Sequence, residues 1–151
     1  MKVVIQRVKK AEVFVNNKLL SSINYGMLVL LGVHESDTDE DMDYIVKKLL
    51  QLRIFDDENG VMNLNVSQIS GEIMLVSQFT LLAYTKKGNR PSYVFAMEPQ
   101  MANIMVNKVA DKIEELFDKK IAKGAFGEHM EISLVNDGPV TIIIDSKNKE
   151  V

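Results

Sequence analysis

The chain contains no cysteine and only two histidines. The first absence excludes disulfide bonds, thiolate nucleophiles and cysteine-ligated metal sites, and it is compatible with a reducing compartment. The two imidazoles, His34 and His129, stand alone in separate loop-like segments, so they do not form the ligand set of a zinc site. The sequence therefore predicts a protein with no metal and no other cofactor.

Long apolar runs and excess positive charge are also missing. No stretch approaches the roughly 20 apolar residues that span a bilayer, and the first ten residues, MKVVIQRVKK, lack a signal-peptide pattern. The 18 basic residues are outnumbered by 21 acidic ones, which gives a net charge of -3. We expect a cytoplasmic protein without membrane contact, and any contact with nucleic acid must be local because a broad cationic face is lacking.

What is present is typical of one globular domain. The chain has 151 residues, of which 46% are hydrophobic and 26% are charged. A domain of this length buries roughly two-thirds of its unfolded surface, whereas two half-length domains would be marginal. We expect a single domain over residues 1–151.

Segments rich in β-branched residues predict a sheet. Asn16 and Asn17 fall between two such segments, and because asparagine tolerates positive φ they can close a hairpin. A continuous apolar run between Gly26 and Gly32 predicts a central strand. The expected strands are residues 2–8, 11–15, 19–23, 27–31, 61–62, 73–82, 130–134 and 140–145.

Two helices are predicted from apolar residues at helical spacing. The first begins after a cap at Ser36, Asp37 or Thr38 and has acidic residues in its first turn. The second begins at Pro99, which suits a first helical position, and continues to Lys119 and Lys120. The apolar faces are Met42, Ile45, Val46, Leu49 and Leu52 in one helix, and Ala102, Met105, Val106, Val109, Ile113, Leu116 and Phe117 in the other.

The acidic stretch before the first helix does not fit a calcium loop. Asp37, Asp39 and Asp41 alternate as calcium ligands do, but Met42 replaces the required glycine and Lys48 the closing glutamate. We interpret this stretch as a helix start. The fold class expected from all these elements is α+β, with a mostly antiparallel, partly rolled or barrel-like sheet, two long amphipathic helices packed on it, and a frayed charged tail over residues 146–151.

The stretch most suggestive of chemistry is residues 73–80, IMLVSQFT, an apolar strand that ends in small polar groups. Ser77 and Thr80 have no neighbouring histidine to act as a base, and the G-x-S-x-G elbow is missing, so a catalytic triad is not predicted. Ser77, Gln78 and Thr80 can instead act as donors to a ligand, or simply bond to nearby backbone. We expect this stretch to meet residues 136–141, NDGPVT, which contain a Gly-Pro step.

Three cations, Lys86, Lys87 and Arg90, lie in a polar loop over residues 83–92. They form either a phosphate-binding patch or a solvated loop tip, and the sequence does not decide between the two.

Three motifs together resemble the D-aminoacyl-tRNA deacylase family, also called D-Tyr-tRNA deacylases. They are VSQFTL at residues 76–81, KGNRPS at 87–92 and GAFGEHMEISLVNDGPVT at 124–141. The similarity runs from MKVVIQRV to the last predicted strand. It implies a homodimeric enzyme that hydrolyses the ester between a D-amino acid, or mischarged glycine, and the 3' end of tRNA.

The same resemblance assigns expected roles to residues. Ser77, Gln78, Phe79 and Thr80 would form the pocket at the ester, with the region of Phe79 and Thr80 donating to the developing oxyanion. Phe126 would lie beside the terminal adenine.

The other implied roles concern chirality. Gly138 and Pro139, joined by a cis bond, would enter the partner subunit's pocket, where their carbonyls bind the α-amino group and exclude an L side chain. Arg7 would hold that loop. The family varies at Tyr84 and His129, so neither receives a role.

The missing base near Thr80 bears on the mechanism. It favours substrate-assisted hydrolysis, in which the ribose 2'-hydroxyl helps a water, over attack by the Thr80 hydroxyl. Two other functions stay open on the sequence. One is a non-catalytic tRNA- or nucleotide-binding module of the same fold, and the other is a related deacylase specific for L-alanine, a form associated with a trans Gly138–Pro139 bond.

Overall fold

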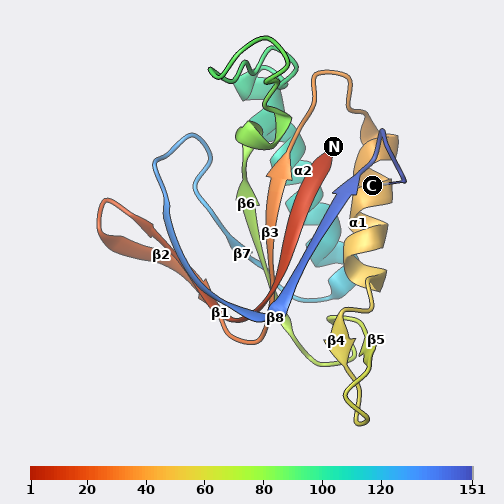
Figure 1. Ribbon diagram of the computed structural model, residues 1–151. Helices are drawn as coiled ribbons and strands as arrows, with labels where there is room; N and C mark the ends of the chain where they lie inside the picture. The colour runs from red at the N-terminus through yellow and green to blue at the C-terminus, as the bar shows by residue number, and fades with distance from the viewer. Residues whose placement is uncertain (151) are drawn as a thin grey trace.

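A computed structural model describes residues 1–150, and two long paired strands dominate it (Figure 1). Strand β1 (Lys2–Val15) and strand β8 (Glu131–Asp145) run antiparallel from the pair Lys2 and Asp145 to the pair Phe14 and Glu131. We expected each to be two shorter strands, which is wrong. Register shifts between Gln6 and Lys10 absorb the irregular residues, so the ladder bends there without breaking.

The other strands complete a curved sheet. Strand β3 (Gly26–Gly32) pairs with the first half of β1, and β2 (Lys18–Ile23) pairs with its second half after a turn in which Asn16 and Asn17 have φ of 51° and 60°. Strands β6 (Glu72–Ser77) and β7 (Ala122–Lys123) follow in parallel pairing beyond β3. A separate small hairpin joins β4 (Phe55–Asp56) to β5 (Met62–Leu64).

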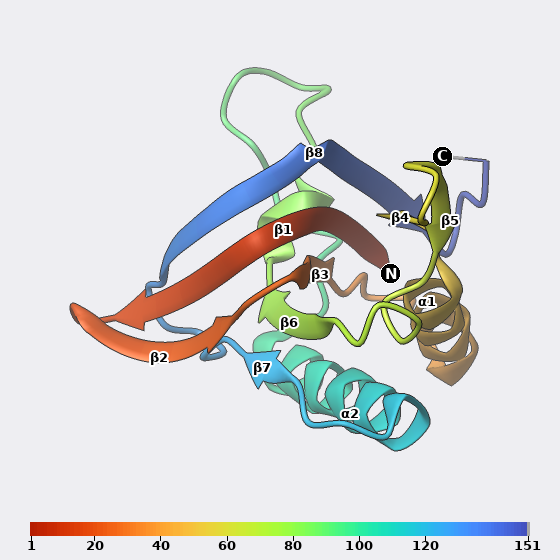
Figure 2. The ribbon, with the colours of Figure 1, turned by 90° about the horizontal axis from the view of Figure 1, so that it is seen from below.

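Both predicted helices are present and cover the same face of the sheet (Figure 2). Helix α1 (Asp39–Gln51) starts at the N-cap Thr38, whose backbone N–H donates to the Asp41 carboxylate at 2.9 Å. Helix α2 (Pro99–Phe117) starts at Glu98, whose carboxylate accepts from two amides of the first turn. It ends earlier than Lys119 and Lys120 because Asp118 turns left-handed, with φ of 54°. The predicted α+β class is confirmed.

Alternate residues of the central strands fill two apolar cores, one on each face of the sheet. The main core packs strand residues against both helices. It includes Val3, Ile5, Val29, Leu31, Ile73 and Leu75 from the sheet, with Ile45, Leu49, Val109 and Ile113 from the helices. The smaller core fills the inside of the curved sheet, with Val8, Val13, Leu28, Met74 and Val76.

The chain leaves the sheet earlier than expected after β6. We predicted a strand over residues 73–82, but β6 ends at Ser77 and a 3₁₀ turn, η1 (Phe79–Leu82), follows. The Gln78 amide donates to the Leu31 carbonyl at 2.7 Å, and the Leu81 amide then bonds back to the Gln78 carbonyl. The polar residues SQFT therefore stand at the end of a buried strand on a tight turn.

The C-terminal segment is more ordered than predicted. Ser146 is buried and its amide donates to the Met1 carbonyl, while the Lys147 ammonium pairs with the Asp41 carboxylate at 2.7 Å. The frayed tail expected over residues 146–151 is therefore wrong at these two positions, and Val151 lies outside the described residues. No helix within residues 1–150 is long and apolar enough to cross a membrane.

Candidate active site

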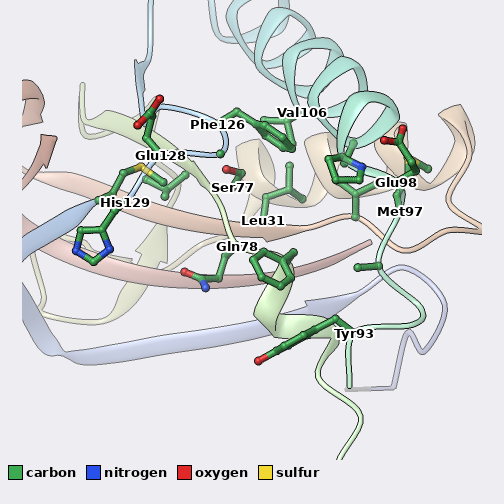
Figure 3. A pocket seen from close by; sticks show the side chains of 18 of the residues that line it. Leu31, Ser77, Gln78, Tyr93, Met97, Glu98, Val106, Phe126, Glu128 and His129 are labelled. Atoms are coloured by element: carbon green, nitrogen blue, oxygen red, sulfur yellow. The ribbon is translucent and has the colours of Figure 1, made fainter. Parts of the chain in front are cut away.

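A cavity of about 560 Å³ lies where β3 and β6 end, beside the first turns of α2 (Figure 3). Its floor comes from the ends of the two strands, and its walls come from α2 and from loop residues 93–98 and 126–130. Apolar side chains form most of the lining, namely Leu31, Val33, Val76, Ala96, Met97, Ala102, Val106, Phe126, Met130 and Ile132. A mostly apolar concavity of this size is typical of a small-molecule site.

The sequence SQFT supplies the polar edge of this cavity. Ser77, Gln78 and Phe79 line it, and Thr80 follows on the 3₁₀ turn, exposed to solvent. The Gln78 carboxamide Nε2 donates to the Thr80 hydroxyl, which fixes the two side chains relative to each other. The structure thus brings three of the four residues into the cavity wall and ties the fourth to them.

At the same place, the first two backbone amides of η1 donate no hydrogen bond within the turn. The first hydrogen bond within η1 is donated by Leu81 to the Gln78 carbonyl at 3.2 Å. The amides of Phe79 and Thr80 precede it, and the first N–H groups of a helical turn have no partner within the turn. They are therefore available to donate to an acceptor bound beside Ser77.

Aromatic rings flank the polar edge. Phe79 is 57% exposed and packs edge-to-face on Tyr93, with ring centroids 4.9 Å apart. Phe126, which follows β7, lies across the cavity from Gln78 (Figure 3). The preceding Gly124 amide is bonded to the Leu75 carbonyl at 2.9 Å, which fixes the start of this loop against β6. A planar group entering the cavity would meet these rings.

The remaining predicted residues form a separate cluster outside the cavity lining. Arg7 is buried, and its guanidinium donates to the carbonyls of Ile54 and Asp137 at 2.8 and 3.2 Å. It also pairs with the carboxylates of Asp56 and Asp137, at 3.2 and 3.1 Å. One arginine therefore joins the start of the small hairpin to the bend of β8.

Gly138 and Pro139 follow directly on this bend. Their peptide bond is cis, Gly138 has φ of 125°, and both residues are exposed. A side-chain carbon at Gly138 would come within 3.3 Å of the Arg7 guanidinium, and its φ disfavours any residue other than glycine. Neither residue lines the cavity of its own chain.

Several lining residues were not predicted from the sequence. Ala102 and Val106 were assigned to the helix face that packs in the core, and at the first turns of α2 this face also borders the cavity. Helical periodicity gives the direction of a side chain without telling a packed neighbour from an empty space. Tyr93 and Glu98 also line the cavity, and no motif in the sequence marked them; His129, which lies within the third motif but received no role, lines it as well.

The site has hydrogen-bond donors and apolar walls but few side chains that could act as a general acid or base. His129, from the loop after β7, is the one histidine among the lining residues, and in Figure 3 its ring points away from Ser77. Within residues 1–150 no group of three or more histidine, aspartate or glutamate side chains is placed to hold a metal ion. The arrangement can bind a planar group and orient an acceptor at its polar edge.

Comparison with known proteins gives matches over nearly the whole chain. Residues 4–145 match the family model described as D-Tyr-tRNA(Tyr) deacylase. Proteins named D-aminoacyl-tRNA deacylase from Flavobacterium psychrophilum and Parabacteroides distasonis are each 53% identical over 150 residues, which is 99% of this chain and all of the relative.

Two solved structures share the fold. One, titled c-Myc DNA Unwinding Element Binding Protein, has a TM-score of 0.92 at 38% identity and covers 96% of this chain and 98% of its own. The other, titled as a structural analysis of a probable eukaryotic D-amino acid tRNA deacylase, has a TM-score of 0.82 at 16% identity, over 95% and 97% of the two chains.

Proposed function

Because the chain belongs to the D-Tyr-tRNA(Tyr) deacylase family and acts as a D-aminoacyl-tRNA deacylase, we propose that the cavity beside Ser77 is where the ester is cleaved. The observation that carries this proposal is the polar edge made by Ser77, Gln78 and the amides of η1 on an otherwise apolar cavity. An aminoacyl-adenosine has matching parts, a planar base and a polar ester.

The terminal adenine would enter the apolar part of the cavity. Phe126 offers a ring for stacking there, and stacking of a base on an aromatic side chain contributes about 1 to 3 kcal/mol. The ester would then lie at Ser77 and Gln78, beside the 3₁₀ turn. The amides of Phe79 and Thr80 would donate to the carbonyl oxygen as negative charge develops on it.

Hydrolysis at this edge is substrate-assisted. Water adds to the ester carbonyl, helped by the ribose 2'-hydroxyl, and the bond from the carbonyl carbon to the ribose 3'-oxygen then breaks. The 3'-oxygen leaves with a proton, which releases tRNA and the free amino acid. The absence of a base beside Thr80 supports this course, because position and aligned donors can supply much of the rate enhancement.

Backbone atoms from a second copy of the chain distinguish D-amino acids from L-amino acids. Gly138 and Pro139 are exposed and lie outside the cavity of their own chain, so they are accessible to the cavity of a partner. Their carbonyls would bind the α-amino group and leave no space for an L side chain. Glycine has no side chain to exclude, so mischarged glycyl-tRNA is also a substrate.

A hydrolysis assay with D-Tyr-tRNA and L-Tyr-tRNA tests this function. We expect release of tyrosine from the D-ester and at least 100-fold slower release from the L-ester, the difference that roughly 3 kcal/mol of steric exclusion gives. Binding of both esters without turnover would contradict the proposal and indicate a non-catalytic module. Faster release of L-alanine from its tRNA than of D-tyrosine would indicate the related L-alanine deacylase.

The name of one structural relative suggests DNA binding, but the charge of this chain gives that function no support. The chain carries -3 overall, whereas binding to duplex DNA relies on many contacts between cations and phosphates. Deacylation of the tRNA 3' end requires only local contacts.

A further inference from the structure

One long segment of this acidic chain has no acidic residue at all. Between Glu72 and Glu98 there is no aspartate or glutamate, although the chain contains 21 of them. The same segment contains Lys86, Lys87 and Arg90, so it carries a charge of +3 in a chain with a net charge of -3. The charge of this segment is therefore opposite in sign to the net charge of the chain.

The structure places these cations next to the cavity. Phe79 and Tyr93, which lie in this segment before and after the three cations, both line the cavity and pack on each other. The loop between them lies beyond the end of β6 and extends away from α2 (Figure 2). The cationic loop therefore begins and ends close to residues of the cavity wall.

The base of this loop is fixed, whereas its tip is solvated. Tyr84 and Ser92 exchange two backbone hydrogen bonds of 2.8 and 3.0 Å. Tyr84 packs edge-to-face on Phe95, and Phe95 stacks on His34 with centroids 5.8 Å apart. The stem of the loop is thus held against the body of the protein, while residues 85–91 are all exposed.

Within the described residues, the three cations also form no ion pair with a carboxylate of the protein. In the part of the chain that the structure describes, Lys2, Lys108 and Lys147 each lie within 4.0 Å of a carboxylate, whereas Lys86, Lys87 and Arg90 form no such pair. Cations that have no internal partner keep their full attraction for an external anion. Since the segment contains no acid and no described carboxylate lies within 4.0 Å of these cations, no internal ion pair competes for them.

We propose that Lys86, Lys87 and Arg90 bind phosphates of the single-stranded 3' end of tRNA, next to the nucleotide held in the cavity. This inference rests on the proposed function, since the cavity must take the terminal nucleoside for the strand to leave past the loop. Contacts at a strand end explain how an acidic protein can handle tRNA without a broad basic face. The loop therefore contributes affinity for tRNA and takes no part in ester cleavage.

The test compares two substrates and two variants. One variant carries Lys86→Gln, Lys87→Gln and Arg90→Gln. The control, Lys18→Gln with Lys47→Gln and Lys48→Gln, removes the same charge from exposed sites on β2 and α1. Each is assayed with D-Tyr-tRNA and with the D-tyrosyl ester of adenosine, which has no phosphate.

For the loop variant we expect the KM for D-Tyr-tRNA at low salt to rise roughly 5- to 50-fold with little change in kcat. Since each phosphate contact on a single strand contributes about 0.7 to the salt slope of log K, the slope should fall by about 2. Turnover of the adenosine ester should not change. The control variant should keep the wild-type KM and nearly the wild-type slope.

Three outcomes would overturn the inference. An unchanged salt slope in the loop variant, an equal effect of the control variant, or an equal loss on the adenosine ester would each show that the loop does not bind the tRNA phosphates. A changed molecular mass in light scattering together with an unchanged slope would assign the loop to contacts between copies of the chain. If wild-type protein cleaved neither substrate, the proposed function itself would fail, which is a distinguishable result.

Discussion

At the scale of single residues, the Thr80 hydroxyl has a partner that orients it and, among residues 1–150, no hydrogen-bonded base that activates it. Gln78 Nε2 donates to it, so its oxygen serves as an acceptor, and a donor does not remove a proton. A nucleophilic hydroxyl needs a base within hydrogen-bond reach. This geometry supports a role for Thr80 in positioning the site.

Replacing Thr80 with alanine should therefore leave most of the single-turnover rate on D-Tyr-tRNA, within roughly tenfold of wild type, because the backbone amides are retained. Quenched-flow measurement of tyrosine release checks this. Loss of roughly 10⁴-fold or more, or an acyl group trapped on Thr80, would show that the hydroxyl is the nucleophile.

Arg7 is a second residue whose neighbours imply a role in positioning. Its guanidinium reaches two carbonyls and two carboxylates at once, and the compact lysine ammonium does not reproduce that fork. Arg7→Lys should lower kcat/KM for D-Tyr-tRNA about 10- to 100-fold and narrow the ratio of D to L hydrolysis, because the Gly138–Pro139 bend loses its support.

The matched control is Arg53→Lys. Arg53 is also bonded to a backbone carbonyl, that of Asn63 at 2.7 Å, but it is exposed in the segment between α1 and the small hairpin. Arg53→Lys should keep the wild-type kcat/KM for D-Tyr-tRNA and the wild-type ratio of D to L hydrolysis. If Arg7→Lys were merely less stable, and its D to L ratio matched wild type at a temperature where it is folded, the positioning role would be wrong.

The sequence identified the polar residues of the site more readily than its shape. Ser77, Gln78 and Phe79 were marked by an abrupt change from apolar to polar residues, and the structure places them together at the cavity. The free space beside Ala102 and Val106 carries no such mark, because a wall of a cavity and a wall of a core need the same apolar residues. The segregation of Arg7, Gly138 and Pro139 from that cavity was likewise invisible in the sequence.

At the scale of elements, periodicity predicted the helices well and the strand ends poorly. Helix α1 begins after Thr38, one of the three caps expected, because the capping residue and the apolar stripe agree. The strand predicted over residues 73–82 failed because Phe79, Leu81 and Leu82 suit a strand as well as a 3₁₀ turn. The backbone bond between Gln78 and Leu31 decides where the ladder stops, and no local pattern encodes it.

The start of α1 also predicts how stability depends on pH. Burial raises the pKa of Asp41, but hydrogen bonds from Lys147, Ser146 and Thr38 outweigh it and hold that pKa well below its usual value. A carboxyl with a depressed folded pKa adds stability above its unfolded pKa, near 4, and loses it as pH falls further. The free energy of unfolding should therefore decline more steeply below about pH 5 in wild type than in Asp41→Asn.

Chemical denaturation between pH 3 and pH 7 measures this difference. At pH 7 we expect Asp41→Asn to lower the free energy of unfolding by about 1 kcal/mol or more, since it removes the carboxylate of the capping box, which is also paired with Lys147. Asp43→Asn is the control, because Asp43 is exposed on the same helix and forms no ion pair within the described residues. Parallel acid limbs for wild type and Asp41→Asn would contradict the assignment.

At the scale of the whole molecule, the unpaired edge of β8 and the exposed Gly138–Pro139 bend belong to the same strand. Among residues 1–150, β8 pairs with β1 alone, so its other edge has no strand partner. Val135 and Ile143 on this strand are 45% and 47% exposed. Exposed apolar residues on an open strand edge are what association with a second copy would cover.

If a partner's Gly138–Pro139 completes each cavity, two differently damaged chains should rescue each other. Gln78→Ala damages the cavity edge, and Pro139→Ala damages the part that would act in the other subunit, so each variant alone should be nearly inactive. In an equimolar mixture after subunit exchange, half of the dimers are mixed and each contains one intact site. About a quarter of wild-type activity should then return.

The control is a mixture of Gln78→Ala with Phe126→Ala. Each change damages the cavity of the chain that carries it, so no mixed dimer contains an intact site and activity should stay at the level of the separate variants. Light scattering on every sample establishes that dimers are present. Equal activity of the first mixture and its separate components, with dimers present, would mean that each chain completes its own site.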